Sequence, residues 1–167
     1  RDSDEGRFDE KVMFEAPYLQ DTIVKLNQTG EIIDQYPVVD MLRQSDYKDI
    51  MPYIYDEGKG DYTHLNALDI VEAGVNTASY MAAGDVLALI RNIDTLVVID
   101  PVQKAIKWAG QMPVHMPHDI DVLPNGHLLL YDNQGHMGGG GYRRLVSLTQ
   151  EGFGLEWQIS AGKEAPS

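Results

Sequence analysis

The clearest fold signal lies in residues 95–108, Thr95-Leu-Val-Val-Ile-Asp-Pro-Val-Gln-Lys-Ala-Ile-Lys-Trp108. A short run rich in β-branched residues, a polar turn with Pro, and a second run ending in an aromatic residue predict a β-hairpin. Two other stretches align with it, Thr22-Ile-Val-Lys-Leu-Asn-Gln-Thr-Gly30-Glu-Ile-Ile-Asp-Gln-Tyr36 and Arg144-Leu-Val-Ser-Leu-Thr-Gln-Glu-Gly152-Phe-Gly-Leu-Glu-Trp157. The chain therefore contains an internal repeat.

A second kind of hairpin precedes two of these repeats, over residues 64–91 and 118–132. The later one turns on Pro124-Asn125-Gly126, a strong turn signal, and the earlier one has an insertion at 72–84. Joined in pairs, the two kinds of hairpin make four-stranded units about 50 to 70 residues apart, close to the blade period of β-propellers. The sequence predicts an all-β chain of about two and a half four-stranded propeller blades.

The blades set the expected organisation of the chain. We expect a polar lead-in over 1–20, a half blade with an inter-blade helix and loop over 21–60, one blade over 61–114, another over 115–160, and a polar tail over 161–167. The helix is expected around Met41-Leu42-Arg43. Because propellers have about 4–8 blades, the remaining blades are expected in the same or another chain.

Composition excludes several classes of partner. A chain of 167 residues with 43% hydrophobic residues has the size of one domain and can bury a core. Its net charge of -13 argues against binding to nucleic acid or an anionic membrane. The absence of cysteine excludes disulfides, a thiolate nucleophile and zinc-thiolate sites. Since no apolar run approaches the roughly 20 residues that cross a bilayer, no membrane span is expected.

Candidate functional residues stand at the ends of the expected strands. His64 and His118 each open a strand, in Asp61-Tyr-Thr-His-Leu-Asn66 and His118-Asp-Ile-Asp-Val-Leu-Pro124. Arg91 ends the otherwise apolar run Asp85-Val-Leu-Ala-Leu-Ile-Arg91, where a buried strand should contain only core residues. Together these residues suggest a cationic pocket.

These motifs, together with Val98-Ile-Asp-Pro101, Ile106-Lys-Trp108 and Leu123-Pro-Asn-Gly-His-Leu-Leu-Leu-Tyr-Asp-Asn133, occur in a fixed order. In that order the chain resembles the arylsulfotransferase family, the PAPS-independent aryl-sulfate sulfotransferases, over about residues 20–160. The resemblance implies a six-bladed β-propeller. It also implies a ping-pong transfer of a sulfuryl group from a phenolic sulfate ester to a phenol, with no nucleotide cofactor. No metal is expected, because Asp119 and Asp121 do not have the spacing of a calcium-binding loop.

The resemblance assigns a role to each candidate residue. His64 and Asn66 match the family's His-x-Asn motif, Arg91 matches its pocket arginine, and His118 matches the histidine that becomes transiently sulfated. The family uses a further histidine in an earlier blade, a small amino-terminal domain and a signal peptide, none of which lies in these 167 residues. Relatives are largely periplasmic or secreted, and the same location is expected here.

Elementary chemistry agrees with these roles. The transferred group spreads negative charge over its oxygens, so its transfer needs donors and cations around it, as in phosphoryl transfer. Arg91 would hold sulfate oxygens with its planar fork, and Asn66 would donate an amide hydrogen bond. His64 would donate another or protonate the departing phenolate, and a neutral His118 imidazole would be the nucleophile.

Each of these residues also has a purely structural interpretation. Arg91 alternatively forms a buried ion pair with Asp85, Asp94 or Asp132. Histidines at strand starts are commonly hydrogen-bonded structural residues, and an asparagine there is commonly a turn or bulge residue. His115, His127 and His136 are expected to be solvated, and Trp108 and Trp157 are expected to pack between blades. The glycine tract at 136–142 is expected to be a hairpin loop, since it lacks the Lys-Ser/Thr ending of a phosphate loop.

Two other functions compete with the sulfotransferase. One is a catalytically silent propeller that serves as a binding or structural module. The other is a sulfatase-like hydrolase, in which water takes the place of the acceptor phenol. Convergence of the candidate side chains would favour chemistry, whereas an Arg91 buried against an aspartate would favour the silent module.

Overall fold

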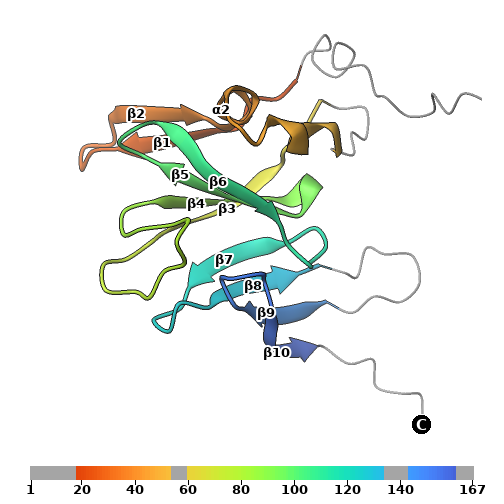
Figure 1. The fold of residues 1–167 in the computed structure, drawn as a ribbon. Helices are drawn as coiled ribbons and strands as arrows, with labels where there is room; N and C mark the ends of the chain where they lie inside the picture. Colours follow the sequence, from red (N-terminus) through yellow and green to blue (C-terminus); the bar gives the residue numbers. More distant parts are fainter. Residues whose placement is uncertain (1–17, 54–59, 134–142, 161–167) are drawn as a thin grey trace, which may run out of the picture. The chain divides into compact units, whose positions relative to one another are not determined.

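The computed structural model describes residues 18–53, 60–133 and 143–160, which Figure 1 draws as a coloured ribbon. They belong to two compact units that divide in the sequence between Thr63 and His64. Antiparallel strands dominate the described residues, which confirms the all-β class. The glycine tract and His136 lie outside the described residues.

Within residues 18–53 and 60–63, the first unit contains a two-stranded hairpin and two short helices. Strand β1 (Thr22–Leu26) pairs antiparallel with β2 (Ile32–Pro37). Helix α2 (Val38–Gln44) follows directly, and the 3-10 helix η1 (Lys48–Tyr53) comes next. The buried residues of α2 are spaced so that they share one face, which explains why this short segment is helical: Val38, Val39, Met41 and Leu42. The expected hairpin and the helix around Met41 are therefore confirmed.

In the second unit, the described residues form two four-stranded antiparallel sheets. The first sheet contains β3 (Leu65–Ile70), β4 (Val86–Ile90), β5 (Thr95–Asp100) and β6 (Ala105–Gln111). The second sheet contains β7 (His118–Val122), β8 (Leu128–Asp132), β9 (Arg144–Leu148) and β10 (Leu155–Ser160). Neighbouring strands are consecutive in the chain, and the 3-10 turn η2 (Arg91–Ile93) joins β4 to β5. This order confirms the four hairpins expected in this unit.

Burial follows the place of each strand in its sheet. In β5 the residues from Thr95 to Ile99 are all buried, as expected for a central strand with both faces covered. Strand β6 alternates between buried and exposed positions, and every residue of the edge strand β10 is exposed. The apolar runs in the sequence therefore mark the middle of each sheet.

One hydrophobic core joins the two sheets. It combines leucine and valine side chains from β4 and β5 with apolar side chains from the second sheet: Leu87, Leu89, Leu96, Val98, Ile120, Leu128, Leu130, Val146 and Leu148. Strands β3 and β7 lie side by side in Figure 1. The Asp69 carboxylate of β3 accepts a 2.8 Å hydrogen bond from the backbone N–H of Val122 in β7. The two sheets are thus joined by both apolar packing and a polar contact.

The Pro124-Asn125-Gly126 turn is confirmed between β7 and β8. The Gly126 N–H donates to the Leu123 carbonyl at 2.7 Å, and Gly126 adopts a left-handed φ of 87°. A Cβ at this position would lie 2.3 Å from the Asn76 carbonyl oxygen of the β3–β4 connection. Glycine is therefore required here both by the turn and by the close approach of a second backbone segment.

The two tryptophans differ in their surroundings. Trp108 of β6 stacks on Tyr80 with ring centroids 4.1 Å apart and contacts Phe153 of the turn between β9 and β10, as expected for packing between the two hairpin pairs. Trp157 of β10 is 40% exposed, so the expectation that it packs between blades is wrong in this structure. Both tryptophans lie on edge strands, but only Trp108 has ring contacts with Tyr80 and Phe153 among the described residues.

Candidate functional site

The candidate residues His64, Asn66, Arg91 and His118 all come from the same ends of their strands. His64 directly precedes β3, Arg91 directly follows β4, and His118 opens β7. Leu65 pairs with Ile90 across β3 and β4, which makes His64 and Arg91 neighbours. The Arg91 N–H donates to the His64 carbonyl at 3.3 Å. Antiparallel pairing thus brings together residues that are distant in sequence.

Asn66 links the beginning of β3 to the residue that precedes β7. Its Nδ2 donates a 3.2 Å hydrogen bond to the carbonyl of Pro117, the residue before His118. Its Oδ1 is buried and accepts no hydrogen bond from any described residue. This side chain therefore has a free acceptor and a second amide hydrogen. A buried acceptor without a donor is unfavourable.

Arg91 is half-buried and contacts neutral acceptors. Its Nη1 donates to Asn92 Oδ1 at 2.9 Å, and its Nη2 lies 3.3 Å from Met116 Sδ. Across residues 18–53, 60–133 and 143–160, no carboxylate pairs with the Arg91 guanidinium. The charge of Arg91 is therefore not neutralised by a described acidic side chain.

The expected alternative for Arg91, an ion pair with a nearby aspartate, is wrong for the described residues. Each of the three aspartates has another cationic or ionisable partner: Asp85 with Lys107 at 2.7 Å, Asp94 with His115 at 3.3 Å and Asp132 with Arg144 at 2.7 Å. The local reason is strand register, which pairs Asp132 of β8 directly with Arg144 of β9.

His118 is half-buried and its imidazole orientation is defined. Nδ1 lies 2.9 Å from the carbonyl oxygen of Met116. Because a carbonyl only accepts hydrogen bonds, Nδ1 is the protonated nitrogen and Nε2 has the lone pair in the neutral ring. The ring also meets Tyr131 edge-on, with centroids 6.4 Å apart and planes at 84°.

Backbone irregularities concentrate at this end of the sheets. Bulges interrupt the register between Leu65 and Ala67 in β3 and between His118 and Ile120 in β7. Four of the six described non-glycine residues with positive φ also lie here: His64, Asp94, Met116 and Asp119. Bulges and left-handed residues redirect side chains and are common beside functional sites.

Sequence reasoning missed the segment at 115–116. His115, expected to be solvated, is half-buried and its Nδ1 lies 3.3 Å from Asp94 Oδ2. Burial raises the pKa of the Asp94 carboxyl, while the Met116 N–H and His115 act in the opposite direction. The one sequence signal was an aspartate directly after the η2 turn, a residue type that tolerates the left-handed conformation.

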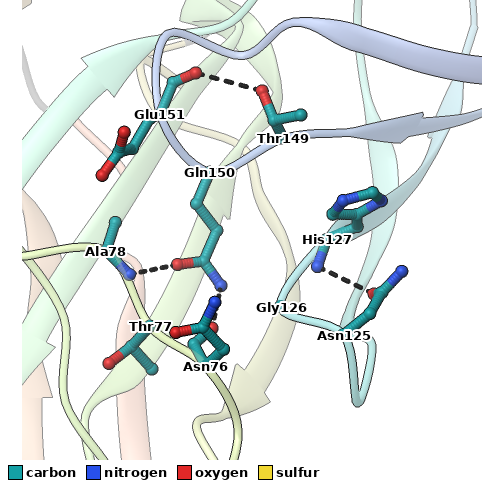
Figure 2. Close-up of a pocket in the computed structure, with 9 residues that line it drawn as sticks. All are labelled: Asn76, Thr77, Ala78, Asn125, Gly126, His127, Thr149, Gln150 and Glu151. Carbon is teal, nitrogen blue, oxygen red and sulfur yellow. Dashed lines mark hydrogen bonds between the residues drawn. The ribbon is translucent and has the colours of Figure 1, made fainter.

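His127 was also expected to be solvated, but it is half-buried. Its Nδ1 is buried without a hydrogen-bond partner among the described residues. The residue lies at the opposite ends of the strands, beside a hollow of about 270 Å³ between the turns at 76–78, 125–127 and 149–151. Figure 2 shows Gln150 bridging this region, with its amide donating to the Asn76 carbonyl and accepting from the Ala78 N–H. This hollow is therefore separate from the four candidate residues.

Two further properties concern metals and membranes. Within the described residues, no group of three or more His, Asp or Glu side chains is arranged to hold a metal ion. A helix long and apolar enough to cross a bilayer does not occur in the same part of the chain.

No protein-family model matches the sequence, and no curated protein matches it either. One similar solved structure is the crystal structure of a protein of unknown function from Bacteroides caccae, with 14% sequence identity and a TM-score of 0.49. The match covers 84% of this chain and 38% of that protein, so the chain spans well under half of its length. A likeness at this level does not indicate a function.

Proposed function

We propose that this chain forms part of an aryl-sulfate sulfotransferase that moves a sulfuryl group from a phenolic sulfate ester to a phenol through a sulfohistidine on His118. The observation that supports this most is the Arg91 guanidinium, which contacts Met116 two residues before His118 and pairs with no described carboxylate. A cation in this state is available to a bound anion. The family resemblance of the ordered motifs supplies the reaction class.

Arg91 retains donors for the sulfate oxygens. Of the five guanidinium N–H groups, one donates to Asn92 and one points to Met116, which leaves the others for a ligand. A planar guanidinium matches the oxygens of a tetrahedral anion with two parallel hydrogen bonds. Arg91 would therefore stabilise the negative charge that spreads over the sulfuryl oxygens during transfer.

His118 has the tautomer that the first half-reaction needs. Its Nε2 lone pair would attack sulfur while the S–O bond to the phenol breaks, and the phenolate would leave with the bonding electron pair. The sulfonated ring then has a hydrogen on Nδ1 and a positive charge, which the Met116 carbonyl stabilises by accepting that hydrogen. In the second half-reaction the acceptor phenol oxygen would attack sulfur, lose its proton to a base, and release the neutral imidazole.

His64 and Asn66 would act on the phenol oxygens. His64 would protonate the departing phenolate and take the proton from the incoming phenol, which is a role that histidine commonly has in general acid–base catalysis. The buried Oδ1 of Asn66, which lacks a donor among the described residues, would accept the hydrogen of a phenol hydroxyl. The second amide hydrogen of Asn66 would remain for a sulfuryl oxygen.

We also propose that the two sheets of the second unit are blades of a six-bladed propeller, with the remaining blades in the same or another chain. In the first sheet, Leu89 pairs with Leu96 and Leu87 with Val98, and this face packs on the second sheet. The same register in the second sheet pairs Tyr131 with Leu145 and Leu129 with Ser147. On this face Ser147 is buried, whereas Leu129, Tyr131 and Leu145 are half-buried and would be covered by another blade.

An aspartate occurs at the same position in each of the two sheets. Asp69 pairs with Leu87 in the first sheet and accepts the Val122 N–H of the second sheet. Asp121 pairs with Leu129 at the matching position of the second sheet and is exposed. It would accept the corresponding N–H of the next blade.

By family resemblance, the location of the whole protein is periplasmic or secreted.

The experiment combines kinetics with intact-mass analysis of the polypeptide that contains residues 1–167. It is incubated with 4-nitrophenyl sulfate and a phenol, beside His118→Asn and the control His127→Asn, whose histidine lies at the opposite ends of the strands. We expect an added sulfuryl mass and acceptor-dependent nitrophenol release for the wild type and the control, and neither for His118→Asn.

Two other outcomes would each replace the proposal. Release of inorganic sulfate without any dependence on the phenol would indicate the sulfatase-like hydrolase. Absence of both adduct and nitrophenol across several aryl sulfates would indicate the catalytically silent propeller.

A further inference from the structure

Met116 contacts both of the residues on which the proposed chemistry depends. Its carbonyl oxygen accepts the Nδ1 hydrogen of His118 at 2.9 Å, and its sulfur lies 3.3 Å from Nη2 of Arg91. One residue therefore sets the imidazole tautomer with its backbone and contacts the guanidinium with its side chain. Sequence motifs around His118 do not reveal this, because Met116 precedes the strand and Arg91 is 25 positions earlier in the chain.

Met116 adopts a conformation that its own chemistry does not favour. Its φ is 46°, in the left-handed region that glycine, asparagine and aspartate populate more readily than methionine. A residue keeps such a conformation only where its surroundings determine it. Some other group must therefore hold the Met116 backbone in place.

Asp94 is that group. Its Oδ1 accepts the Met116 N–H at 2.7 Å, and its Oδ2 lies 3.3 Å from Nδ1 of His115. Hydrogen bonds to an ionised carboxylate are stronger than neutral ones. Asp94 also closes the η2 turn, where its N–H donates to the Arg91 carbonyl at 3.3 Å. A single carboxylate thus contacts the turn that begins at Arg91 and the segment that leads to His118.

A second carboxylate supports the same segment. The fully buried Asp132 accepts the His115 N–H at 2.9 Å and pairs with Arg144 at 2.7 Å. Adjacent backbone N–H groups at 115 and 116 are therefore held by two different aspartates, one from the turn between β4 and β5 and one from β8. The segment before His118 is fixed from both sides.

We infer that Asp94 and Met116 are positioning residues of the proposed site: Asp94 holds the Met116 backbone, and Met116 in turn sets the His118 tautomer and the place of the Arg91 guanidinium. The catalytic role of these two residues rests on the proposed function, whereas their contacts are those described above. A thioether suits the position because it accepts a hydrogen bond without charge. A carboxylate there would neutralise Arg91 and compete with an anionic substrate.

The test reads the tautomer of His118 directly, so it does not depend on turnover. Long-range 1H–15N NMR correlations assign the hydrogen to Nδ1 or Nε2 in the wild type, Asp94→Ala, Asp94→Asn and Met116→Leu. We expect the Nδ1–H form in the wild type and a mixture in Asp94→Ala. Asp94→Asn should retain the Nδ1–H form, because the Asn Oδ1 still accepts the Met116 N–H. Met116→Leu should retain it as well, because the carbonyl is unchanged.

A second readout separates the two roles of Met116. Titration with inorganic sulfate, followed through the Arg91 side-chain NMR signals, should show several-fold weaker binding for Met116→Leu, since an unanchored guanidinium loses more freedom on binding. The matched control is Met112→Leu, a buried methionine of the core, which should leave sulfate binding unchanged.

Clear results would overturn the inference. An Nε2–H tautomer in the wild type, or an unchanged tautomer in a folded Asp94→Ala protein, would exclude the role of Asp94. Sulfate affinity within twofold of wild type for Met116→Leu would exclude the role of its side chain. If Asp94→Ala does not fold, the wild-type tautomer still tests the contact between the Met116 carbonyl and His118. A fixed tautomer with no sulfuryl adduct would instead reject only the proposed function.

Discussion

Nη2 of Arg91 lies 3.3 Å from the sulfur of Met116, so this half-buried guanidinium is placed against a neutral group. The comparison within the same unit is Arg144, whose Nε donates to the fully buried Asp132 carboxylate at 2.7 Å. The two arginines occupy similar environments but only one has a described carboxylate partner. We therefore expect Arg144 to contribute to stability and Arg91 to contribute to anion binding.

Replacement of Arg144 should mainly lower stability, whereas replacement of Arg91 should mainly lower anion binding. Arg144→Leu leaves the buried Asp132 without its cation and should lower the free energy of unfolding by about 3 kcal/mol or more. Arg91→Leu removes no described ion pair and should change it by less than about 1 kcal/mol, but it should abolish sulfate binding. Urea unfolding and sulfate titration measure the two effects. A large loss of stability in Arg91→Leu would point to an unrecognised structural ion pair.

The turn at Gly126 should be sensitive to a single added methyl group. Gly126→Ala places a Cβ 2.3 Å from the Asn76 carbonyl oxygen in a residue whose φ is 87°. Gly74→Ala is the matched control, because its φ is 89° but no atom lies within 4 Å of the added Cβ. We expect Gly74→Ala to cost about 1 kcal/mol for the left-handed conformation alone.

The steric part of the Gly126 effect is then the difference between the two variants. Gly126→Ala should cost about 1–3 kcal/mol more than Gly74→Ala, as overpacked substitutions do. Thermal unfolding of both variants gives the comparison. Equal losses in the two would mean that the 76–78 segment moves aside freely.

Tyr80 should make stability depend on pH in the alkaline range. Its hydroxyl donates to the Gln150 carbonyl at 2.6 Å, and burial, followed by the charge of Glu151, raises its pKa to about 12. Because the folded-state pKa exceeds the ordinary value of 10.0, this stabilisation is complete below pH 10 and is lost as the pH rises through about 12.

Tyr80→Phe is the informative variant because it retains the ring that stacks on Trp108. The wild type should be more stable than Tyr80→Phe by about 1 kcal/mol at pH 8, and the difference should vanish between about pH 10 and 12. Urea unfolding across this range measures it. A difference that stays constant through pH 12 would contradict the raised pKa.

The two tryptophans should differ in their contributions to stability. Trp108→Ala removes a ring that packs between Tyr80 and Phe153 and should cost about 3 kcal/mol or more. Trp157→Ala removes a ring that is 40% exposed and should cost about 1 kcal/mol. In a polypeptide with a further blade on this face, Trp157 should become as costly to remove as Trp108. Similar losses in the chain of 167 residues would show that Trp157 is already covered.

Local sequence was sufficient wherever a feature depends on neighbouring residues. Alternating or continuous apolar runs between Gly and Pro turns indicated the hairpins, since strand formation depends on side-chain alternation and turn geometry over a few positions. The positions of His64, Asn66, Arg91 and His118 at strand ends followed from the same reasoning. Antiparallel pairing of β3 with β4 brings His64 beside Arg91, and packing of the two sheets adds the segment that leads to His118.

The tertiary structure decided which groups contact each other at that site. Arg91 faces Met116, and Asp94 and Asp132 hold the 115–116 segment, because bulges and left-handed residues shift side chains by one position and change their direction. Trp108 and Trp157 look equivalent in the repeat, yet only Trp108 is covered by a neighbouring sheet. The sequence by itself determined the strands and the identity of the candidate residues, whereas hydrogen-bond partners, tautomer and exposure depend on contacts between distant residues that only the folded sheets create.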